Sequence, residues 1–221
     1  MLDRKIRYLQ IAFNSDLSSV NRILPLIEEN DRILIEAGTP FIKREGFYGI
    51  TRISRLWNGM IAADLKTSDG ALGEVELAHQ AGASAATVLG SAPIETINIF
   101  VKKCKELGMD SMIDMLNVEE PLKVLLQLKE PPNVVVLHKG RDEETTRGKM
   151  IKYKHINKIR SKYDVLISAA GGVDLKEARS AIFNGANIVV VNLVSGEDNV
   201  IGITEDQDIA EIAEQFLKTI E

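Results

Sequence analysis

Short apolar runs alternate with longer amphipathic stretches along the whole chain. The runs at residues 134–137 and 188–191 are rich in β-branched residues and are bounded by polar ones, which is typical of strands buried on both faces of a parallel sheet. Eight such runs predict strands at residues 7–13, 32–36, 60–65, 85–89, 111–115, 134–138, 165–169 and 188–191.

Helical patterns lie between these runs, at residues 17–29, 70–80, 93–107, 118–128, 150–162, 175–184 and 205–220. Asp174 is in place to cap the helix that starts at Leu175, and Gly82, Gly108 and Gly185 each follow a predicted helix. Residues 41–57 fit no pattern well, and we expect a short helix there.

Eight strands with helices between them and short connections predict a single (β/α)8 barrel domain over residues 1–221. An open, doubly wound sheet is the competing architecture. No Gly-x-Gly-x-x-Gly follows the first strand, which removes the main support for a dinucleotide site.

Composition narrows the classes of partner. The net charge is -5 with Lys and Arg scattered, which argues against nucleic acid. Cys104 is the single cysteine, so it forms no internal disulfide and we expect it to pack in the core. Because the N-terminus carries no long apolar signal region and no segment approaches a membrane helix, we expect a soluble, cytoplasmic protein without a membrane partner.

The most informative stretch is Asp64-Leu65-Lys66-Thr67-Ser68-Asp69, at the end of a predicted strand. A strand interior does not tolerate these charges unless they neutralise each other or hold a ligand. Alternation along the strand places Asp64 and Lys66 on one side, and Asp69 closes the group from the loop. Such an array can bind a divalent metal, hold a substrate hydroxyl and move a proton.

Barrel enzymes build their active sites at the carboxyl ends of the strands. Other polar residues and glycines fall at these ends too: Asn14, Glu36, Asp114, Asn117, His138, Arg141, Gly171, Gly172 and Asn192. Three carboxylates, a lysine, a histidine and an arginine would thus converge, which is more specific than any one of them.

Several of these residues have two interpretations. Glu36 either pairs with Lys66 or joins Asp64 in a Mg²⁺ site, since Mg²⁺ takes one or two carboxylates plus waters and substrate oxygens. His138 is either a hydrogen-bonded structural residue or a catalytic one. The Gly171–Gly172 pair is either a tight turn or a place where backbone N–H groups meet a phosphate. His79 and His155 lie on predicted helices, and we expect both at the surface.

Taken together, these motifs resemble the orotidine 5'-phosphate decarboxylase superfamily, in the branch of 3-hexulose-6-phosphate synthase and 3-keto-L-gulonate-6-phosphate decarboxylase. The resemblance covers nearly the whole chain. It runs through Leu9-Gln-Ile-Ala-Phe-Asn14, Ile35-Glu-Ala-Gly-Thr-Pro40, Ala63-Asp-Leu-Lys-Thr-Ser-Asp69, Thr87-Val-Leu-Gly90, Asp114-Met-Leu-Asn-Val118, Leu137-His138 and Ala170-Gly-Gly172.

The resemblance implies a homodimer with active sites at the subunit interface and a phosphorylated ketose as substrate. It implies that Glu36 and Asp64 ligate Mg²⁺, that Lys66 contacts the substrate and that Asp69 reaches into the partner's site. His138 would carry the proton of an enediolate that Mg²⁺ stabilises. That intermediate takes up formaldehyde in an aldol addition, or a proton after loss of CO₂.

Two further features bear on whether the chain is more similar to the synthase or to the decarboxylase. Asp114 to Asn117 is similar to the synthase, whereas Arg141 is similar to the decarboxylase. We favour the synthase, with the decarboxylase as the alternative; a divergent barrel that binds a ligand without the family reaction is the third hypothesis.

Two departures from the family motivate that third hypothesis. Asn14 stands where the family has Asp, and Leu193 stands where it has a glycine-rich or Gly-Arg phosphate-binding sequence. Ser195 and Gly196 are the candidates to replace the latter. We expect substrate contacts from Asn14, Asn117, Arg141, Gly171, Gly172 and Asn192.

Overall fold

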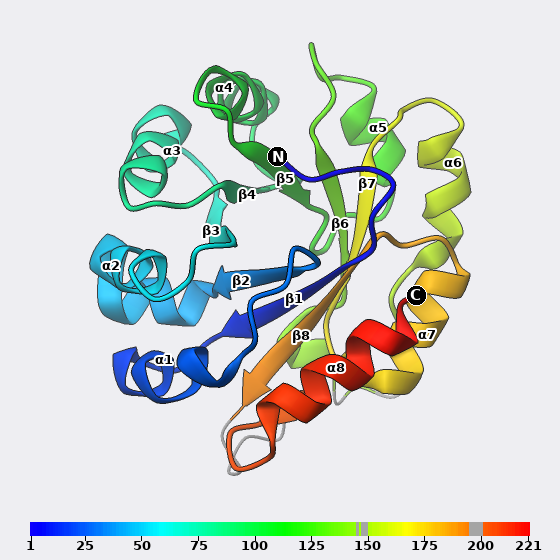
Figure 1. Ribbon diagram of the computed structural model, residues 1–221. Helices are drawn as coiled ribbons and strands as arrows, with labels where there is room; N and C mark the ends of the chain where they lie inside the picture. Colours follow the sequence, from blue (N-terminus) through cyan, green and yellow to red (C-terminus); the bar gives the residue numbers. More distant parts are fainter. Residues whose placement is uncertain (145, 147–149, 195–200) are drawn as a thin grey trace.

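The computed structural model, which describes residues 1–144, 146, 150–194 and 201–221, is a closed barrel of parallel strands. The strands follow one another in chain order, and β1 also pairs with β8 (Figure 1). This last pairing confirms the (β/α)8 barrel, because an open sheet would leave both edges free. The strands are β1 (Tyr8–Phe13), β2 (Ile33–Ala37), β3 (Met60–Thr67), β4 (Ala85–Leu89), β5 (Asp110–Asp114), β6 (Val134–His138), β7 (Leu166–Ala170) and β8 (Ile188–Val194), with a short β9 (Ile203–Thr204) parallel to β8.

The helices form a ring around the strands (Figure 1). They are α1 (Leu17–Ile23), α2 (Thr39–Ser54), α3 (Ala71–Gln80), α4 (Ile94–Glu106), α5 (Pro121–Leu125), α6 (Ile156–Arg160), α7 (Leu175–Phe183) and α8 (Ile209–Thr219). Asp174 caps α7 as predicted, since its carboxylate accepts a hydrogen bond of 2.7 Å from the N–H of Glu177.

Some predicted helices have different lengths. The helix expected within residues 41–57 is longer, because α2 starts at Thr39 with Pro40 in its first turn and continues past a break at Gly46. The helix expected at 118–128 is shorter, because Pro121 fits only at the start of α5. The helix expected at 150–162 is a 3₁₀ turn, Tyr153–His155, followed by the five residues of α6.

The surface position predicted for His155 is wrong. This side chain is 2% exposed, because the 3₁₀ turn directs it into the protein, and burial lowers its pKa. His79 is exposed on α3 as expected. Cys104 is fully buried in the core, which raises the pKa of its thiol to about 12 and confirms its packing role.

The barrel interior is apolar at one end and polar at the other. An inner cluster that includes Tyr8, Leu34 and Ile188 fills the N-terminal half. Leu2 and Ile6 pack against this cluster, and the N–H of Leu2 donates to Asp110 at 2.8 Å. In Figure 1 the dark blue N-terminal segment crosses the strands before entering β1. Within the described residues, the cavity lined by several polar side chains lies at the C-terminal end of the interior.

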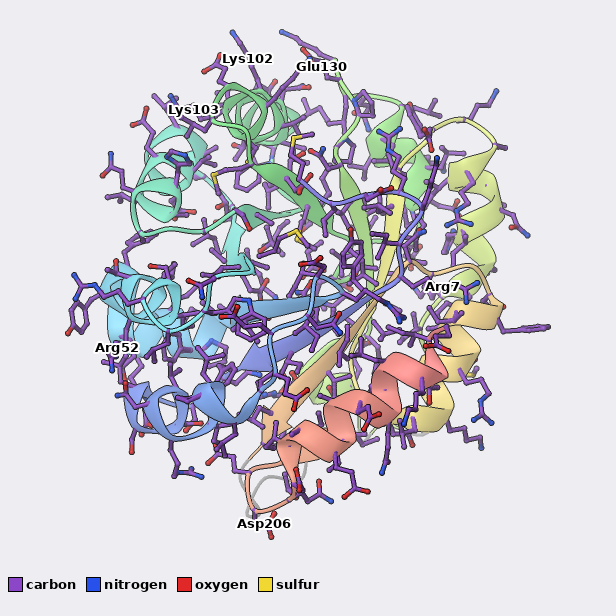
Figure 2. The ribbon with its side chains drawn as sticks, viewed as in Figure 1. Arg7, Arg52, Lys102, Lys103, Glu130 and Asp206 are labelled. Carbon is purple, nitrogen blue, oxygen red and sulfur yellow. The ribbon has the colours of Figure 1, made fainter. Side chains whose placement is uncertain are left out.

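Charged side chains gather on the outside of the helical ring. Figure 2 shows Arg52, Lys102, Lys103 and Glu130 at its periphery, and Arg7 beside the end of α8, where its guanidinium donates to the carbonyl of Ile220 at 3.4 Å. Lys103 on α4 ties this helix to α3 through a contact of 2.7 Å with Glu76. No helix in the described ranges is long and apolar enough to cross a membrane.

Candidate active site

A cavity of about 630 Å³ lies at the carboxyl ends of the strands. It receives most of the site residues predicted from the sequence: Asn14, Glu36, Asp64, Lys66, Asn117, His138, Arg141, Gly171 and Asn192. Gln10, Thr39, Thr87 and Asp114 also line it. Every second residue of a strand points into the barrel. Because all eight strands are parallel, the last inward-facing residue of each one lies at the same end of the barrel, and these side chains meet there.

Asp64 and Lys66 form an ion pair in the middle of this cavity. The Lys66 Nζ lies 2.5 Å from Asp64 Oδ2 and 3.3 Å from Asp114 Oδ2. Thr39 Oγ1 donates to Asp64 Oδ2 at 2.7 Å, and Thr87 Oγ1 donates to Asp64 Oδ1 at 2.9 Å. Both oxygens of Asp64 are thus held in place from neighbouring elements.

Lys66 reaches Asp64 through an irregular strand rather than through simple alternation. The register between β3 and β4 shifts between Ala63 and Thr67, and Lys66 adopts φ 47°. Its N–H donates to Thr87 Oγ1 at 2.9 Å, which stabilises this conformation. A non-glycine residue in the left-handed region costs about 1–3 kcal/mol and is found mostly at functional sites.

Asp114 connects Lys66 to His138. His138 Nδ1 lies 2.8 Å from Asp114 Oδ2, so the ring has a fixed orientation and Nε2 is left to meet a ligand. Burial alone would lower the pKa of His138, but the Asp114 carboxylate outweighs burial and the pKa is raised. Burial would raise the pKa of Asp114, but His138 and Lys66 together lower it. The pair therefore favours a charged imidazolium beside a carboxylate.

Glu36 has a different environment. Its side chain is 7% exposed and accepts a hydrogen bond from Gln10 Nε2. Within the described residues the ion pairs of Lys66 go to Asp64 and Asp114, so Glu36 is not the partner of Lys66. Burial and the nearby Asp64 carboxylate raise the pKa of Glu36 to about 7.

The donor set fits Mg²⁺. Three buried carboxylates, from Glu36, Asp64 and Asp114, face one lysine and one histidine, so a cation at Glu36 and Asp64 would offset the excess negative charge. Among the described residues no three His, Cys, Asp or Glu side chains converge in a metal-binding arrangement. A site with two carboxylates is sufficient for Mg²⁺, because waters and substrate oxygens complete its coordination.

The predicted substrate contacts lie around the edge of the cavity. Asn14 Nδ2 donates to Asn192 Oδ1 at 3.1 Å, so the two amides are oriented by each other. Asn117 and Arg141 are exposed at the entrance. Asn117 has φ 58°, a conformation that asparagine tolerates better than most residues.

The two glycines after β7 form a tight turn that packs closely against Lys139. Gly171 has φ 101°, and a Cβ there would lie 1.9 Å from the carbonyl oxygen of Lys139. A Cβ on Gly172 would lie 3.1 Å from Lys139 Nζ and 3.5 Å from Glu144 Cδ. Gly171 lines the cavity, whereas Gly172 is beneath Lys139 and Glu144.

Glu144 places a carboxylate where an anion would meet this turn. Burial raises its pKa, while the N–H of Ile201, the charges of Lys139 and Arg141 and the N–H of Gly172 act in the opposite direction. Two cations and two backbone donors therefore surround this carboxyl group, which is the chemistry of an anion site.

Asp69 is not brought to the cavity of its own chain. It is exposed in the loop between β3 and α3 and lies outside the cavity lining. Leu193 is 3% exposed and packs in the outer core, so its side chain is no part of the site. Ser195 and Gly196 lie outside the described residues.

Sequence reasoning missed Gln10, Thr39 and Thr87, and gave Asp114 no role of its own. Gln10 and Thr87 are polar residues at inward positions of apolar strands, and that alternation is the signal that would have identified them. Thr39 lies outside a strand, so only the fold brings it to Asp64.

Comparisons with known proteins identify the family of this chain. The family model described as "Orotidine 5'-phosphate decarboxylase / HUMPS family" matches residues 7–197. Proteins called "Bifunctional enzyme Fae/Hps" from Methanothrix thermoacetophila and Methanosarcina barkeri are each 38% identical over 215 residues, which is 96% of this chain and 52% of theirs. The chain thus spans about half the length of these relatives.

Solved structures give the same picture. 3-Hexulose-6-phosphate synthase from Salmonella typhimurium has a TM-score of 0.84 at 26% identity, covering 96% of this chain and 98% of that one. KGPDC from Streptococcus mutans has a TM-score of 0.76 at 20% identity over 97% of each chain, which shows the shared fold alone. The chain belongs to the orotidine 5'-phosphate decarboxylase / HUMPS family.

Proposed function

We propose that this chain is a Mg²⁺-dependent carbon–carbon lyase of the 3-hexulose-6-phosphate synthase type. It would join formaldehyde to ribulose 5-phosphate, or run the reverse reaction. The observation that carries the proposal is the chain of contacts from Asp64 through Lys66 and Asp114 to His138 in one cavity. The similarity to 3-hexulose-6-phosphate synthase supports this choice of substrates.

Glu36 and Asp64 would hold the metal ion. When bound, Mg²⁺ supplies Lewis-acid stabilisation of the negative charge that develops on neighbouring carbonyl and hydroxyl oxygens. Asp64 is already oriented by Thr39 and Thr87, and Glu36 by Gln10. A cation at Asp64 would share its Oδ2 with the ammonium of Lys66, which lies 2.5 Å away.

Lys66 stabilises the enediolate from the protein side. Burial would lower its pKa, but Asp64 and Asp114 raise it, so the ammonium stays charged at neutral pH. A fixed cation beside the reacting oxygens favours the state in which negative charge develops on them.

His138 would carry the proton. Its Nδ1 is held by Asp114, so Nε2 is the atom that exchanges a proton with the substrate. In its neutral form, His138 Nε2 accepts a proton from the carbon beside the ketone, which gives the enediolate and an imidazolium that Asp114 stabilises. The enediolate carbon then attacks the aldehyde carbon, and the imidazolium returns the proton to the aldehyde oxygen.

The remaining residues would bind the sugar phosphate. Asn14, Asn192 and Asn117 offer amides to its hydroxyl groups, while Arg141 and the turn at Gly171 and Gly172 would meet its phosphate. The proposal also places the protein in the cytoplasm, where such a phosphorylated substrate would be found.

The same proposal includes a homodimer in which Asp69 completes the partner's site. Asp69 is exposed and outside its own cavity, as a residue that serves a neighbouring subunit must be. Tyr48 on α2 and Leu72 on α3 expose apolar surface on the two helices that flank β3, which supports a contact there.

A second candidate is the decarboxylation of a 3-keto sugar acid phosphate. Arg141 favours it, because this guanidinium lines the cavity and would attract a substrate carboxylate. Both reactions would use the same Lys66 and His138.

Steady-state assays with both substrate sets separate the candidates. With Mg²⁺ present, we expect consumption of formaldehyde together with ribulose 5-phosphate, and little CO₂ from 3-keto-L-gulonate 6-phosphate. The reverse preference would assign the decarboxylase. Failure of the folded protein to turn over either set would favour a barrel that only binds its ligand.

A further inference from the structure

Gln10 is a buried amide in the wall of the cavity. It lies in the middle of β1, is 3% exposed and faces the barrel interior between Tyr8 and Ala12, which belong to the apolar inner cluster. It also lines the cavity together with Glu36. A polar side chain at such a depth needs a physical reason.

The reason is its contact with Glu36. Gln10 Nε2 donates to Glu36 Oε2, whereas the ammonium of Lys66 is shared by the other two carboxylates. A neutral donor fixes the orientation of a carboxylate without cancelling its charge. The Gln10 amide therefore leaves the charge of Glu36 available to a cation, whereas a directly paired lysine or arginine would have neutralised it.

The carbonyl oxygen of the Gln10 amide indicates that this residue does not serve the stability of the fold. Its Oε1 is buried and has no hydrogen-bond partner among the described residues. An unsatisfied buried acceptor destabilises the fold, and an apolar side chain of similar volume would avoid that cost. The amide thus destabilises the fold, and its presence is explained by a role in the site rather than by packing in the core.

We propose that Gln10 is a positioning residue for the Mg²⁺ site, where its amide N–H holds Glu36 in the orientation that receives the cation. The inference rests on the proposed function. It assigns no contact between Gln10 and substrate; Gln10 acts through Glu36.

The test compares Gln10→Met with Ser168→Ala as a matched control. Ser168 is also fully buried inside the barrel, with a hydroxyl that has no partner in the described part of the chain, but it lies outside the cavity lining. Isothermal titration of metal-free protein with MgCl₂ gives the Kd. We expect Gln10→Met to weaken Mg²⁺ binding by roughly 10–100-fold, as loss of a residue that orients a metal ligand typically does, and Ser168→Ala to leave it unchanged.

Activity provides a second readout. In Gln10→Met the Mg²⁺ concentration for half-maximal activity should rise, while kcat and the KM of the sugar phosphate recover at saturating Mg²⁺. A residue needed only for packing would lower the melting temperature and leave the Kd unchanged. Should Gln10→Met not fold, Gln10→Asn retains the amide but is one methylene too short to reach Glu36, and the same weakening is expected.

The outcomes separate the two proposals. A parental protein that binds Mg²⁺ and turns over, with a Gln10→Met Kd equal to the parent's, would overturn the role of Gln10 alone. A parental protein that neither binds Mg²⁺ nor needs it for turnover would overturn the metal site, and with it this inference.

Discussion

At the scale of single residues, Glu36 is held by a neutral amide, whereas Asp64 and Asp114 both contact Lys66. Burial and the nearby Asp64 carboxylate give Glu36 a pKa of about 7, against 4.5 for an ordinary glutamate. Ionising it in the metal-free protein is therefore unfavourable, and a bound cation would remove that cost. The same carboxylate thus links stability, pH and metal binding.

This linkage predicts how stability depends on pH. Because the folded pKa of Glu36 is raised, the metal-free protein should lose stability from about pH 4.5 to about pH 7, by about 3 kcal/mol. His138 acts in the same direction: its raised pKa gives stability below pH 6.5 that is lost as pH rises through the folded pKa. Asp114, with a lowered pKa, gives stability above pH 3.8 that is lost in stronger acid.

Chemical denaturation of Glu36→Gln and the parent over this pH range measures the effect. The variant should be more stable than the metal-free parent at pH 8 and should show no stabilisation by Mg²⁺. Equal losses with rising pH in both proteins would show that Glu36 is not the group responsible.

Asp114→Asn tests the link to His138. Without the carboxylate, burial acts on the imidazole almost unopposed, so the pKa of His138 should fall from its raised value to below the ordinary 6.5. Proton-transfer catalysis should fall on the order of 10²-fold. An NMR titration of the His138 ring gives the pKa. An unchanged pKa would contradict the role of Asp114 in stabilising the charged ring of His138.

At the scale of elements, strand ends and turns determine where the site residues lie. The irregular end of β3 turns Lys66 toward Asp64, and the turn after β7 lets the backbone pass the Lys139 carbonyl at a distance that allows no Cβ. Lys66 carries a conformational cost in its backbone, whereas Gly171 avoids one because it has no Cβ, and both positions border the cavity.

Gly171→Ala should therefore destabilise the protein by at least roughly 1–3 kcal/mol and lower activity. Gly73→Ala is the matched control, because Gly73 lies in α3 and no described atom is within 4 Å of the added methyl group. It should stabilise the protein by about 0.5–1 kcal/mol. Urea denaturation measures both, and a tolerated Gly171→Ala would contradict the close packing against Lys139.

Much of the fold and site could be predicted from the sequence because barrel strands place alternate residues at a common end. That regularity was enough to bring Glu36, Asp64 and His138 together, whereas Lys66 reaches Asp64 through the irregular end of β3. It was not enough to find Thr39, because this residue begins α2 rather than lying in a strand. Thr39 reaches Asp64 because β2, which precedes α2, pairs with β3.

Pro121 could have marked the start of α5, but the early end of α5 and the short α6 were not predictable, since helix length there depends on packing. The burial of His155 has the same origin, because a 3₁₀ turn places its side chain differently from an α-helix.

At the scale of the whole molecule, the barrel has one closed apolar end and one polar end with a cavity. Asp69 belongs to neither the cavity nor the core of its own chain. In the proposed homodimer, Asp69 would complete the site of the partner subunit, and this makes the proposal testable.

Mixing two inactive variants tests the shared site. Asp69→Ala and Lys66→Ala should each be inactive alone, but a refolded equal mixture should regain roughly a quarter of the parental activity, because half of the random dimers carry one intact site. Light scattering should give a dimer for each preparation. A mixture as inactive as its components would contradict the role of Asp69 across the interface.

The most direct test of the proposed reaction follows the new carbon–carbon bond itself. The protein is incubated with ¹³C-formaldehyde, ribulose 5-phosphate and MgCl₂, and the label is followed by NMR, with Asp64→Asn as the control. We predict that the label enters a hexulose phosphate with coupling to its neighbouring carbon, and that Asp64→Asn and chelator both abolish this signal. Formaldehyde that stays unincorporated with folded parental protein, or incorporation that is unchanged in Asp64→Asn, would contradict the proposed metal-dependent synthase.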